Sequence, residues 1–467
     1  MEKATNFLHH EAIQPANDKS SGFFFDNSSA VLDKLSSLIL DGDLSDVQLR
    51  VGRQVFNAHK LILCSRSDVF RTMLTSPTWP EAHTKQVVLK EDEECVEVFS
   101  IFLNYLYTGR IFLKESNALP ILTLGDKYNV SDLSRACLEF MCTHCLPSAS
   151  GYIVMWLQYA IFCGCRKLED ICQKFVLHNF QMIAQTPVFN LMHVDILCNF
   201  MKSSDVVVKD EFHLYLAVKG WFNAQTFSDR SERENLFQKV MNHVRFPMMQ
   251  LDQLAYLEHD ELVKEFKDFF LQKLFDAIKH RSLDTSPRCT KDKSTVSSSC
   301  LQYLARNYTN DTWSTTISVE KLNLLLPGEV QGAFFSTPFG GSSVDQHWDW
   351  HLNLYPKGIR FQQCLMIQAF SNKVIEETMY KTIRLSISSD KLERRAVSIC
   401  VFVLASQDGT EYICSGVSKY MIFDKEKSLC NINDIVDFNE LHKINSPFCV
   451  GEDKNTFKVL IIIKPMS

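Results

Sequence analysis

Residues 281–299, "RSLDTSPRCTKDKSTVSSS", constrain the fold of this chain more than any other segment. The segment is rich in Ser, Thr and Lys and offers almost no apolar side chain for burial, which is typical of a linker. Before it, apolar residues recur at helical spacing over most of the chain. After it, runs such as "RAVSICVFVLAS" and "FKVLIIIKP" are of β type and are separated by Gly, Asp and Asn. The chain therefore divides into a largely helical part and a β-rich part.

Length and charge limit the classes of protein to which the chain can belong. Its 467 residues are enough for about three domains. The net charge of −6 argues against nucleic acid as the main partner, because phosphate contacts need clustered Lys and Arg. The start of the chain lacks a basic stretch followed by an apolar core, and no apolar run approaches roughly 18 residues. We therefore expect no signal peptide and no membrane partner, and we expect the protein in the cytoplasm or the nucleus.

The pattern of residues 1–60 predicts a tail, a helix and a hairpin. Residues 1–28 are polar and aperiodic, which indicates a disordered tail. The following "AVLDKLSSLIL" predicts a helix at residues 30–40. "DVQLRV" and "RQVFNA" then predict two strands that turn at Gly52. The apolar face of the predicted helix consists of Val31, Leu35, Leu38 and Ile39.

Helices dominate the prediction from residue 60 onward. "HKLILCSRSDVFRTML" predicts two helices with a break near Ser65 and with Ser67 as a cap, and "QVVL" predicts a short strand. "CVEVFSIFLNYLY" predicts a helix that ends at Gly109. Residues 146–280 continue as helices joined by short turns, which indicates a helical bundle or solenoid. The apolar face of the helix before Gly109 holds Val98, Phe99, Phe102, Leu103, Leu106 and Tyr107.

The C-terminal region predicts a β-sandwich. In "QHWDWHLNLYPKG", every second side chain is apolar, as expected of a strand with one face in a core. A peptide-binding groove is the alternative interpretation of this segment. The side chains assigned to the core are Trp348, Trp350, Leu352 and Leu354.

Three stretches resemble known domain families. "DGDLSDVQLRVGRQVFNAHKLILCSRSDVFRTML", a strand and "VFSIFLNYLYTGRI" resemble a BTB/POZ domain, and "DVVVKDEFHLYLAVKGWF" with "VRFPMM" resembles the BACK helical domain. "WDWHLNLYPKG" resembles MATH/TRAF-like sandwiches. We therefore predict a multidomain protein whose order of parts most resembles the BTB/POZ domain-containing protein 17 family. The predicted parts are an α+β BTB/POZ domain (29–145), an all-α BACK domain (146–280), a linker (281–299) and a MATH/TRAF-like β-sandwich (300–467).

The BTB resemblance implies a role for the segment "LTSPTWPEAHTKQVVL". BTB adaptors of cullin-3 place a hydrophobic residue, any residue and a glutamate before this strand, and the matching positions are Trp79, Pro80 and Glu81. The prolines on either side make the segment a poor helix interior, so Trp79 is expected on a loop. The resemblance implies that Trp79 enters a groove on the cullin. The alternative is that Trp79 packs on its own domain.

The same resemblance implies a charged pocket and a homodimer. Asp46 and Lys60 match a partly buried charged pair that BTB domains keep, and in some relatives this pocket meets co-repressors. We favour a structural pair here, since a buried charge without its partner is costly. The apolar helix at residues 30–40 is of the kind that packs across a BTB two-fold axis, so we expect an isologous homodimer.

Nothing in the sequence indicates catalysis or a cofactor. Phosphate loops, dinucleotide fingerprints, nucleophile elbows and kinase signatures are absent. "CTHC" (142–145) and "CGC" (163–165) are predicted within helices, where neighbouring side chains diverge, so we expect no metal site. The preferred function is a substrate adaptor of a cullin-3 RING ubiquitin ligase that recruits an unidentified protein through its C-terminal domain. The alternatives are a BTB scaffold or transcriptional co-regulator without cullin binding, and a secreted BTB–BACK glycoprotein.

Overall fold

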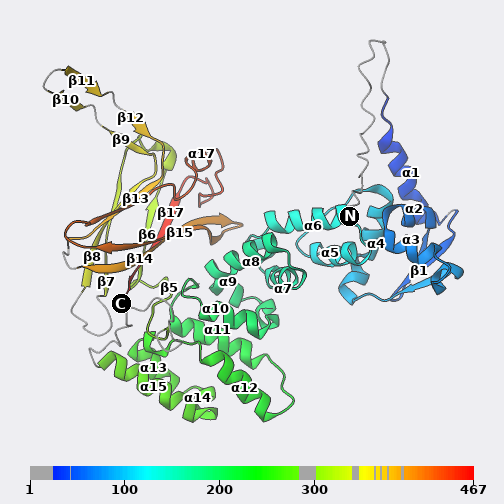
Figure 1. Ribbon diagram of the computed structural model, residues 1–467, viewed down its shortest axis with the longest axis horizontal. Coiled ribbons are helices and arrows are strands. Elements are labelled where there is room, and N and C mark those ends of the chain that lie inside the picture. The colour runs from blue at the N-terminus through cyan, green and yellow to red at the C-terminus, as the bar shows by residue number, and fades with distance from the viewer. Residues whose placement is uncertain are drawn as a thin grey trace, which may run out of the picture. The chain divides into compact units, whose positions relative to one another are not determined.

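The computed structural model describes residues 25–42, 44–282, 301–338, 347–361, 364–368, 371–375, 378–390 and 394–466 (Figure 1). The chain divides into two compact units, Met1–Leu113 with Pro120–Arg135, and Lys114–Leu119 with Ala136–Ser467. Most of the predicted tail (1–28) and nearly all of the predicted linker (281–299) lie outside the described residues. Within the described residues, no helix has the length and apolarity needed to span a membrane.

The first unit contains a small sheet with the order β2-β1-β3. β1 (Val47–Val51) and β2 (Gln54–Ala58) form the predicted antiparallel hairpin, which turns at Gly52 with a φ of +57°. β3 (Gln86–Leu89) is the predicted short strand and runs parallel to β1. The helices up to residue 143 are α1 (Ser28–Asp41), α2 (Lys60–Arg66), α3 (Asp68–Thr75), η1 (Pro80–His83), α4 (Glu93–Thr108), α5 (Ala118–Lys127) and α6 (Ser131–Thr143).

Local signals in the sequence determine where these helices begin and end. The Ser67 hydroxyl accepts a hydrogen bond from the Phe70 amide at 3.0 Å, so Ser67 is the predicted cap and also separates α2 from α3. Gly109 ends α4 in the left-handed conformation, with a φ of +66°. The predicted apolar face of α4 is entirely buried, and Phe70 stacks on Tyr128 at 4.4 Å beside it. The prediction of this face is therefore confirmed.

Up to residue 282, the described part of the second unit consists of helices and the short strand β4. Its first part contains η2 (Pro147–Ala149), α7 (Ile153–Cys163), α8 (Arg166–His178), α9 (Phe180–Ala184), η3 (Pro187–Leu191), α10 (Val194–Lys202) and β4 (Val207–Val208). The remaining elements are α11 (Glu211–Asn223), α12 (Arg230–Met241), η4 (Phe246–Met248), α13 (Leu251–Leu257), α14 (Glu261–Glu265) and α15 (Lys267–Ser282). Aspartate side chains cap α11, α12 and α14, which satisfies amides that the first helical turn leaves unpaired.

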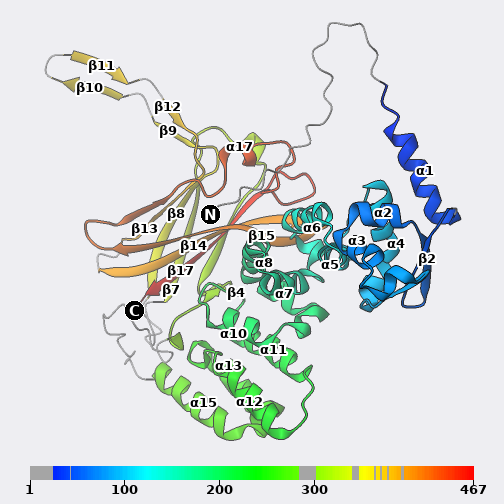
Figure 2. The same ribbon diagram turned by 45° about the vertical axis from the view of Figure 1, so that its right-hand side comes forward.

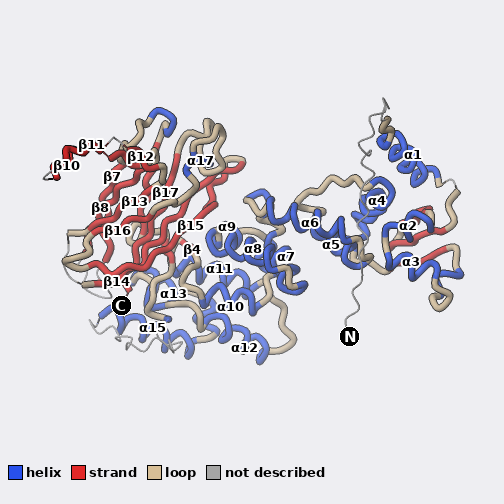
Figure 3. Tube along the Cα trace, turned by 45° about the horizontal axis from the view of Figure 1, so that its top comes forward, coloured by secondary structure: helices blue, strands red, loops and turns tan. Residues whose placement is uncertain are grey.

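Beyond residue 301 the second unit is a β-sandwich, and the change from helix to strand is plain in Figure 3. Among the described strands, one sheet has the order β16-β13-β8-β7 and the other the order β15-β14-β17-β6. Their members are β6 (Ser314–Val319), β7 (Gln331–Pro338), β8 (His347–Tyr355), β13 (Arg384–Ser388), β14 (Arg395–Gln407), β15 (Thr410–Phe423), β16 (Leu429–Ile432) and β17 (Phe457–Met466). Shorter elements are β5 (Asn307–Tyr308), η5 (Leu322–Leu324), β9 (Ile359–Phe361), β10 (Cys364–Gln368), β11 (Ser371–Ile375), β12 (Thr378–Tyr380) and α17 (Phe438–Leu441).

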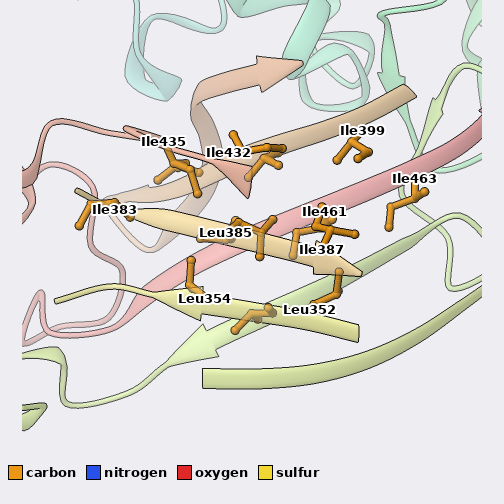
Figure 4. Close-up of a cluster of buried hydrophobic side chains, with 14 of the residues drawn as sticks. Leu352, Leu354, Ile383, Leu385, Ile387, Ile399, Ile432, Ile435, Ile461 and Ile463 are labelled. Atoms are coloured by element: carbon orange, nitrogen blue, oxygen red, sulfur yellow. The ribbon is translucent and has the colours of Figure 1, made fainter. Parts of the chain in front are cut away.

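The core of the sandwich lies between the two sheets. Leu352 and Leu354 from β8 meet Ile461 and Ile463 from β17, and every one of these side chains is fully buried (Figure 4). Trp348 and Trp350 are also fully buried, with ring centroids 4.8 Å apart. The predicted core face of this segment is therefore confirmed, and its apolar side chains do not line an open groove.

Candidate functional site

Trp79 lies on the segment that joins α3 to β3. The Trp79 amide donates to the Ser76 carbonyl at 3.0 Å, and the Ala82 amide donates to the Trp79 carbonyl at 3.1 Å. Pro80 is the first residue of the short helix η1, a position at which a missing amide donor removes no helical hydrogen bond. Residues 76–79 therefore link α3 to η1, and Trp79 is the last residue before η1.

Hydrogen bonds order the rest of this loop. His83 Nε2 lies 3.1 Å from the Pro77 carbonyl oxygen, and the Thr84 hydroxyl donates to the Glu81 carbonyl at 3.3 Å. The Lys60 ammonium donates to the Ala82 carbonyl at 3.4 Å, which ties the loop to α2. A loop that is already ordered loses little conformational entropy when a partner binds it.

The Trp79 side chain is 46% exposed. Trp156, Trp221, Trp348 and Trp350 are at most 2% exposed, so their role is to fill cores. Among the described residues, no aromatic ring stacks on Trp79 and no cation lies over it. Its own domain therefore leaves close to half of its large apolar surface in water.

Glu81 is half-buried beside Trp79, and its Oε2 atom is buried without a hydrogen-bond partner among the described residues. An ionised carboxylate accepts hydrogen bonds through both oxygens, and leaving a buried acceptor unsatisfied costs about 1–3 kcal/mol. The Trp79–Pro80–Glu81 segment thus combines an exposed apolar side chain with an acceptor that lacks a donor.

Asp46 and Lys60 do not form the predicted pair of charged side chains. Among the ion pairs of the described residues, there is none between these two groups. The Asp46 carboxylate is exposed and accepts a hydrogen bond from the backbone amide of Lys60 at 2.8 Å. The Lys60 ammonium instead reaches the Ala82 carbonyl. The two residues therefore position the start of α2 and the Trp79 loop, and they do not make a closed ionic pocket.

The predicted dimerisation face on α1 is partly covered by its own unit. Leu35 and Leu38 are half-buried, Val31 is 54% exposed, and the side chain of Ile39 lies outside the described residues. An exposed ion pair between Asp33 and Arg110, whose atoms lie 3.4 Å apart, also links the helix to its own unit. The dimer itself remains a prediction.

The Cys–His segments are predicted within helices, and they lie there only in part. α6 ends at Thr143, so His144 and Cys145 follow it, and Cys163 is the last residue of α7. Gly164 breaks the chain there with a φ of +69°. Within the described residues, no group of three or more His, Cys, Asp or Glu side chains is arranged to hold a metal ion. Partial burial raises the pKa of the Cys142 thiol.

Comparisons with known proteins define the class to which these parts belong. Family models match residues 35–145 as "BTB/POZ domain", residues 153–258 as "BTB And C-terminal Kelch" and residues 303–467 as "BTBD17 TRAF domain". The chain is therefore a BTB–BACK protein with a C-terminal TRAF-like domain, and the predicted fold class is confirmed. The domain boundaries given above remain predictions.

Several relatives are similar to part of this chain. BTB/POZ domain-containing protein 17 of Xenopus laevis is 26% identical over 304 residues, which cover 63% of this chain and 61% of the relative. The human protein of the same name is 29% identical over 246 residues, which cover 51% of this chain and 49% of that protein. Human Kelch repeat and BTB domain-containing protein 8 is 23% identical over 278 residues, or 59% and 43% of the two chains. The matches thus span about half to three fifths of the proteins named BTB/POZ domain-containing protein 17.

This class has general properties that bear on function. BTB/BACK proteins are generally non-catalytic scaffolds, and none of the matching families is enzymatic. BTB domains commonly form homodimers, and the chain is related to Kelch/BTB proteins. The architecture is therefore adaptor-like.

Proposed function

We propose that this chain is a substrate adaptor of a cullin-3 RING ubiquitin ligase. In this proposal it forms a homodimer, binds the cullin through its BTB and BACK domains, and recruits a protein substrate through its C-terminal domain. The observation that carries the proposal is the 46% exposure of Trp79 on a loop ordered by hydrogen bonds. A large, rigid apolar side chain presented in this way has the profile of an interface hot spot. Such an adaptor acts in the cytoplasm or the nucleus, where cullin ligases work.

The three residues of the loop have different roles in this proposal. Trp79 enters an apolar groove on the N-terminal helices of the cullin, and Pro80 limits the conformations of the loop. The Oε2 atom of Glu81 accepts a hydrogen bond from a donor on the cullin, because it lacks a partner among the described residues of its own chain. Hydrogen bonds to charged groups contribute about 1.5–3 kcal/mol. Glu81 therefore matters for affinity together with Trp79.

Dimerisation and substrate capture use other surfaces. Val31, Leu35, Leu38 and Ile39 on α1 meet their counterparts in a second copy, and the exposure of Val31 supports this arrangement. The sheet β16-β13-β8-β7 supports substrate capture, since its outer face presents Phe334, which is 61% exposed and lies 5.4 Å from the ring of His351.

Gel filtration of the full chain with the N-terminal domain of cullin-3 tests the proposal. The wild-type chain and the cullin domain should elute together, and Trp79→Ala should elute separately from it. Phe112→Ala is the matched control, because Phe112 is another exposed aromatic residue of the same unit at 74% exposure. It should behave like the wild type.

The alternative function is a BTB scaffold or transcriptional co-regulator without cullin binding. It predicts that the wild-type chain elutes apart from the cullin domain while still forming a dimer. In that case the exposed Trp79 would bind a protein other than cullin-3.

A further inference from the structure

A buried cluster of charged and polar side chains joins the BACK helices to the start of the C-terminal domain. Glu211 from the first turn of α11 and Arg306 from beyond residue 301 are both 0% exposed. The Arg306 Nε atom lies 3.0 Å from Glu211 Oε2, and the Tyr308 hydroxyl donates to the same oxygen at 2.6 Å. The backbone amide of Arg245 donates to Glu211 Oε1 at 2.7 Å. Donors from both domains therefore satisfy a single buried carboxylate.

Each of the two arginines also donates hydrogen bonds to backbone carbonyls of the other domain. Arg306 reaches back to the BACK domain, where its terminal nitrogens donate to the carbonyls of Ser203 at 2.5 Å and His243 at 2.8 Å. Arg245 reaches forward from the BACK domain and donates to the Leu304 carbonyl at 2.7 Å. Beside them, β4 pairs in parallel with β5, so backbone hydrogen bonds also cross the junction.

A second polar contact covers an outer strand of the sandwich. β15 is the outermost strand of its sheet, and α8 lies beside it (Figures 2 and 3). The Asn179 side chain, which is 7% exposed, accepts from the Ile413 amide at 2.8 Å and donates to the Ile413 carbonyl at 3.1 Å. Its amide thus satisfies both backbone groups of one residue on this strand, as a neighbouring strand would.

The outer face of the same sheet carries a second apolar cluster. This cluster is separate from the core between the sheets and includes Val207 from β4 in the BACK region. The ring of His178 packs against Phe402 with centroids 5.1 Å apart, and the Lys464 ammonium, which is almost fully buried, donates to the Ser204 carbonyl at 3.3 Å. The sandwich members of the cluster, Cys400, Phe402, Ile413, Leu460 and Ile462, are each at most 8% exposed.

We infer that the BACK helices are the built-in partner of the C-terminal domain, and that the two form one structural unit. Without the BACK helices, the sandwich would expose this apolar cluster to water, together with Arg306 and Tyr308. A buried ion pair that loses one member leaves an uncompensated charge, so the Glu211–Arg306 contact also discourages separation. The contacts themselves, and not the connection through residues 283–300, hold the domains together. A partner of the C-terminal domain must therefore bind a surface other than the covered face of β14 and β17.

The inference is tested by cutting the connection in the full chain. A recognition site for a sequence-specific protease is inserted between Lys291 and Lys293, and the cleaved protein is analysed by gel filtration at micromolar concentration. The two fragments should elute together, because the junction does not need the peptide bond. Separation of the wild-type fragments would overturn the inference.

Amino-acid substitutions test whether the contacts of Glu211 and Asn179 hold the two fragments together. Glu211→Gln should raise the dissociation constant between the fragments at least about tenfold, since it leaves the Arg306 charge without its partner. Asn179→Ala should weaken the association by a smaller factor. If Glu211→Gln does not fold, this variant replaces it in the test. Glu265→Gln is the matched control, because it removes an exposed Glu–Arg pair within the BACK domain and should change nothing. Wild-type association in both Glu211→Gln and Asn179→Ala would contradict the role given to these contacts.

Discussion

Replacing Glu211 by Gln should destabilise the BACK helices and the sandwich together. The substitution keeps the shape of the side chain but removes the charge that faces Arg306, and both side chains are fully buried. Breaking a buried pair by removing one member typically costs about 3–5 kcal/mol. The glutamine also replaces one of the two accepting oxygens with an NH₂ group, which then faces another donor, either the Arg245 amide or the Tyr308 hydroxyl. For a unit of this size, each kcal/mol lowers the melting temperature by roughly 2 °C. We therefore expect a fall of about 6–10 °C.

Differential scanning calorimetry of the full chain measures this effect. The second unit should still unfold in a single transition, at a lower temperature. The reason is that the Glu211–Arg306 pair joins the BACK helices to the sandwich. Glu265→Gln should lower the melting temperature by less than about 2 °C, since a surface ion pair contributes at most about 1 kcal/mol. The double variant Glu211→Gln/Arg306→Gln should lose less than the sum of the single variants, because neither member of the pair is then left charged without the other. A Glu211→Gln variant that melts like Glu265→Gln would refute the reasoning.

Three further predictions follow from other parts of the chain. Ser67→Ala should cost about 1–2 kcal/mol in the free energy of unfolding measured with urea, because its hydroxyl caps α3 and donates to the Tyr128 carbonyl at 2.6 Å. Burial lowers the pKa of His178 and His243 in the folded state, so the unfolded chain binds more protons. The stability that these histidines contribute should be complete above their unfolded pKa of about 6.5 and should decline as the pH falls below it, as thermal melts from pH 7.5 to 5.5 would show. Val31→Asp should shift the chain toward the monomer in light scattering, since a charge on the exposed end of the α1 face opposes an apolar dimer contact.

The parts of the fold that depend on local pattern could be predicted from the sequence. The hairpin at Gly52, the Ser67 cap and the buried face of α4 each follow from residues within a few positions of one another. The exposed position of Trp79 also follows locally, because prolines on either side limit the helix. The roles of Asp46 and Lys60 could not be predicted, since residue type does not tell whether a carboxylate meets a side chain or a backbone amide.

The junction between the BACK helices and the sandwich could not be predicted in this way. Glu211 and Arg306 are 95 positions apart, and charged residues are usually exposed, so neither stands out in the sequence. A signal was nevertheless present in "SICVFVLA" and "KVLIIIK", which are apolar at nearly every position. Such runs indicate strands buried on both faces. In β17, Ile461 faces the core between the sheets, whereas Ile462 belongs to the cluster at the BACK helices.

Calorimetric titration of the full chain with the N-terminal domain of cullin-3 tests the proposed function most directly. Truncating an interface anchor such as Trp79 typically costs about 2 kcal/mol or more, which is roughly a thirtyfold loss of affinity. We expect Trp79→Ala to weaken binding by at least this factor while its melting temperature stays close to that of the wild type, because the side chain is 46% exposed. Phe112→Ala should bind as the wild type does. A Trp79→Ala variant that keeps wild-type affinity, or that loses binding only because it has unfolded, would contradict the account.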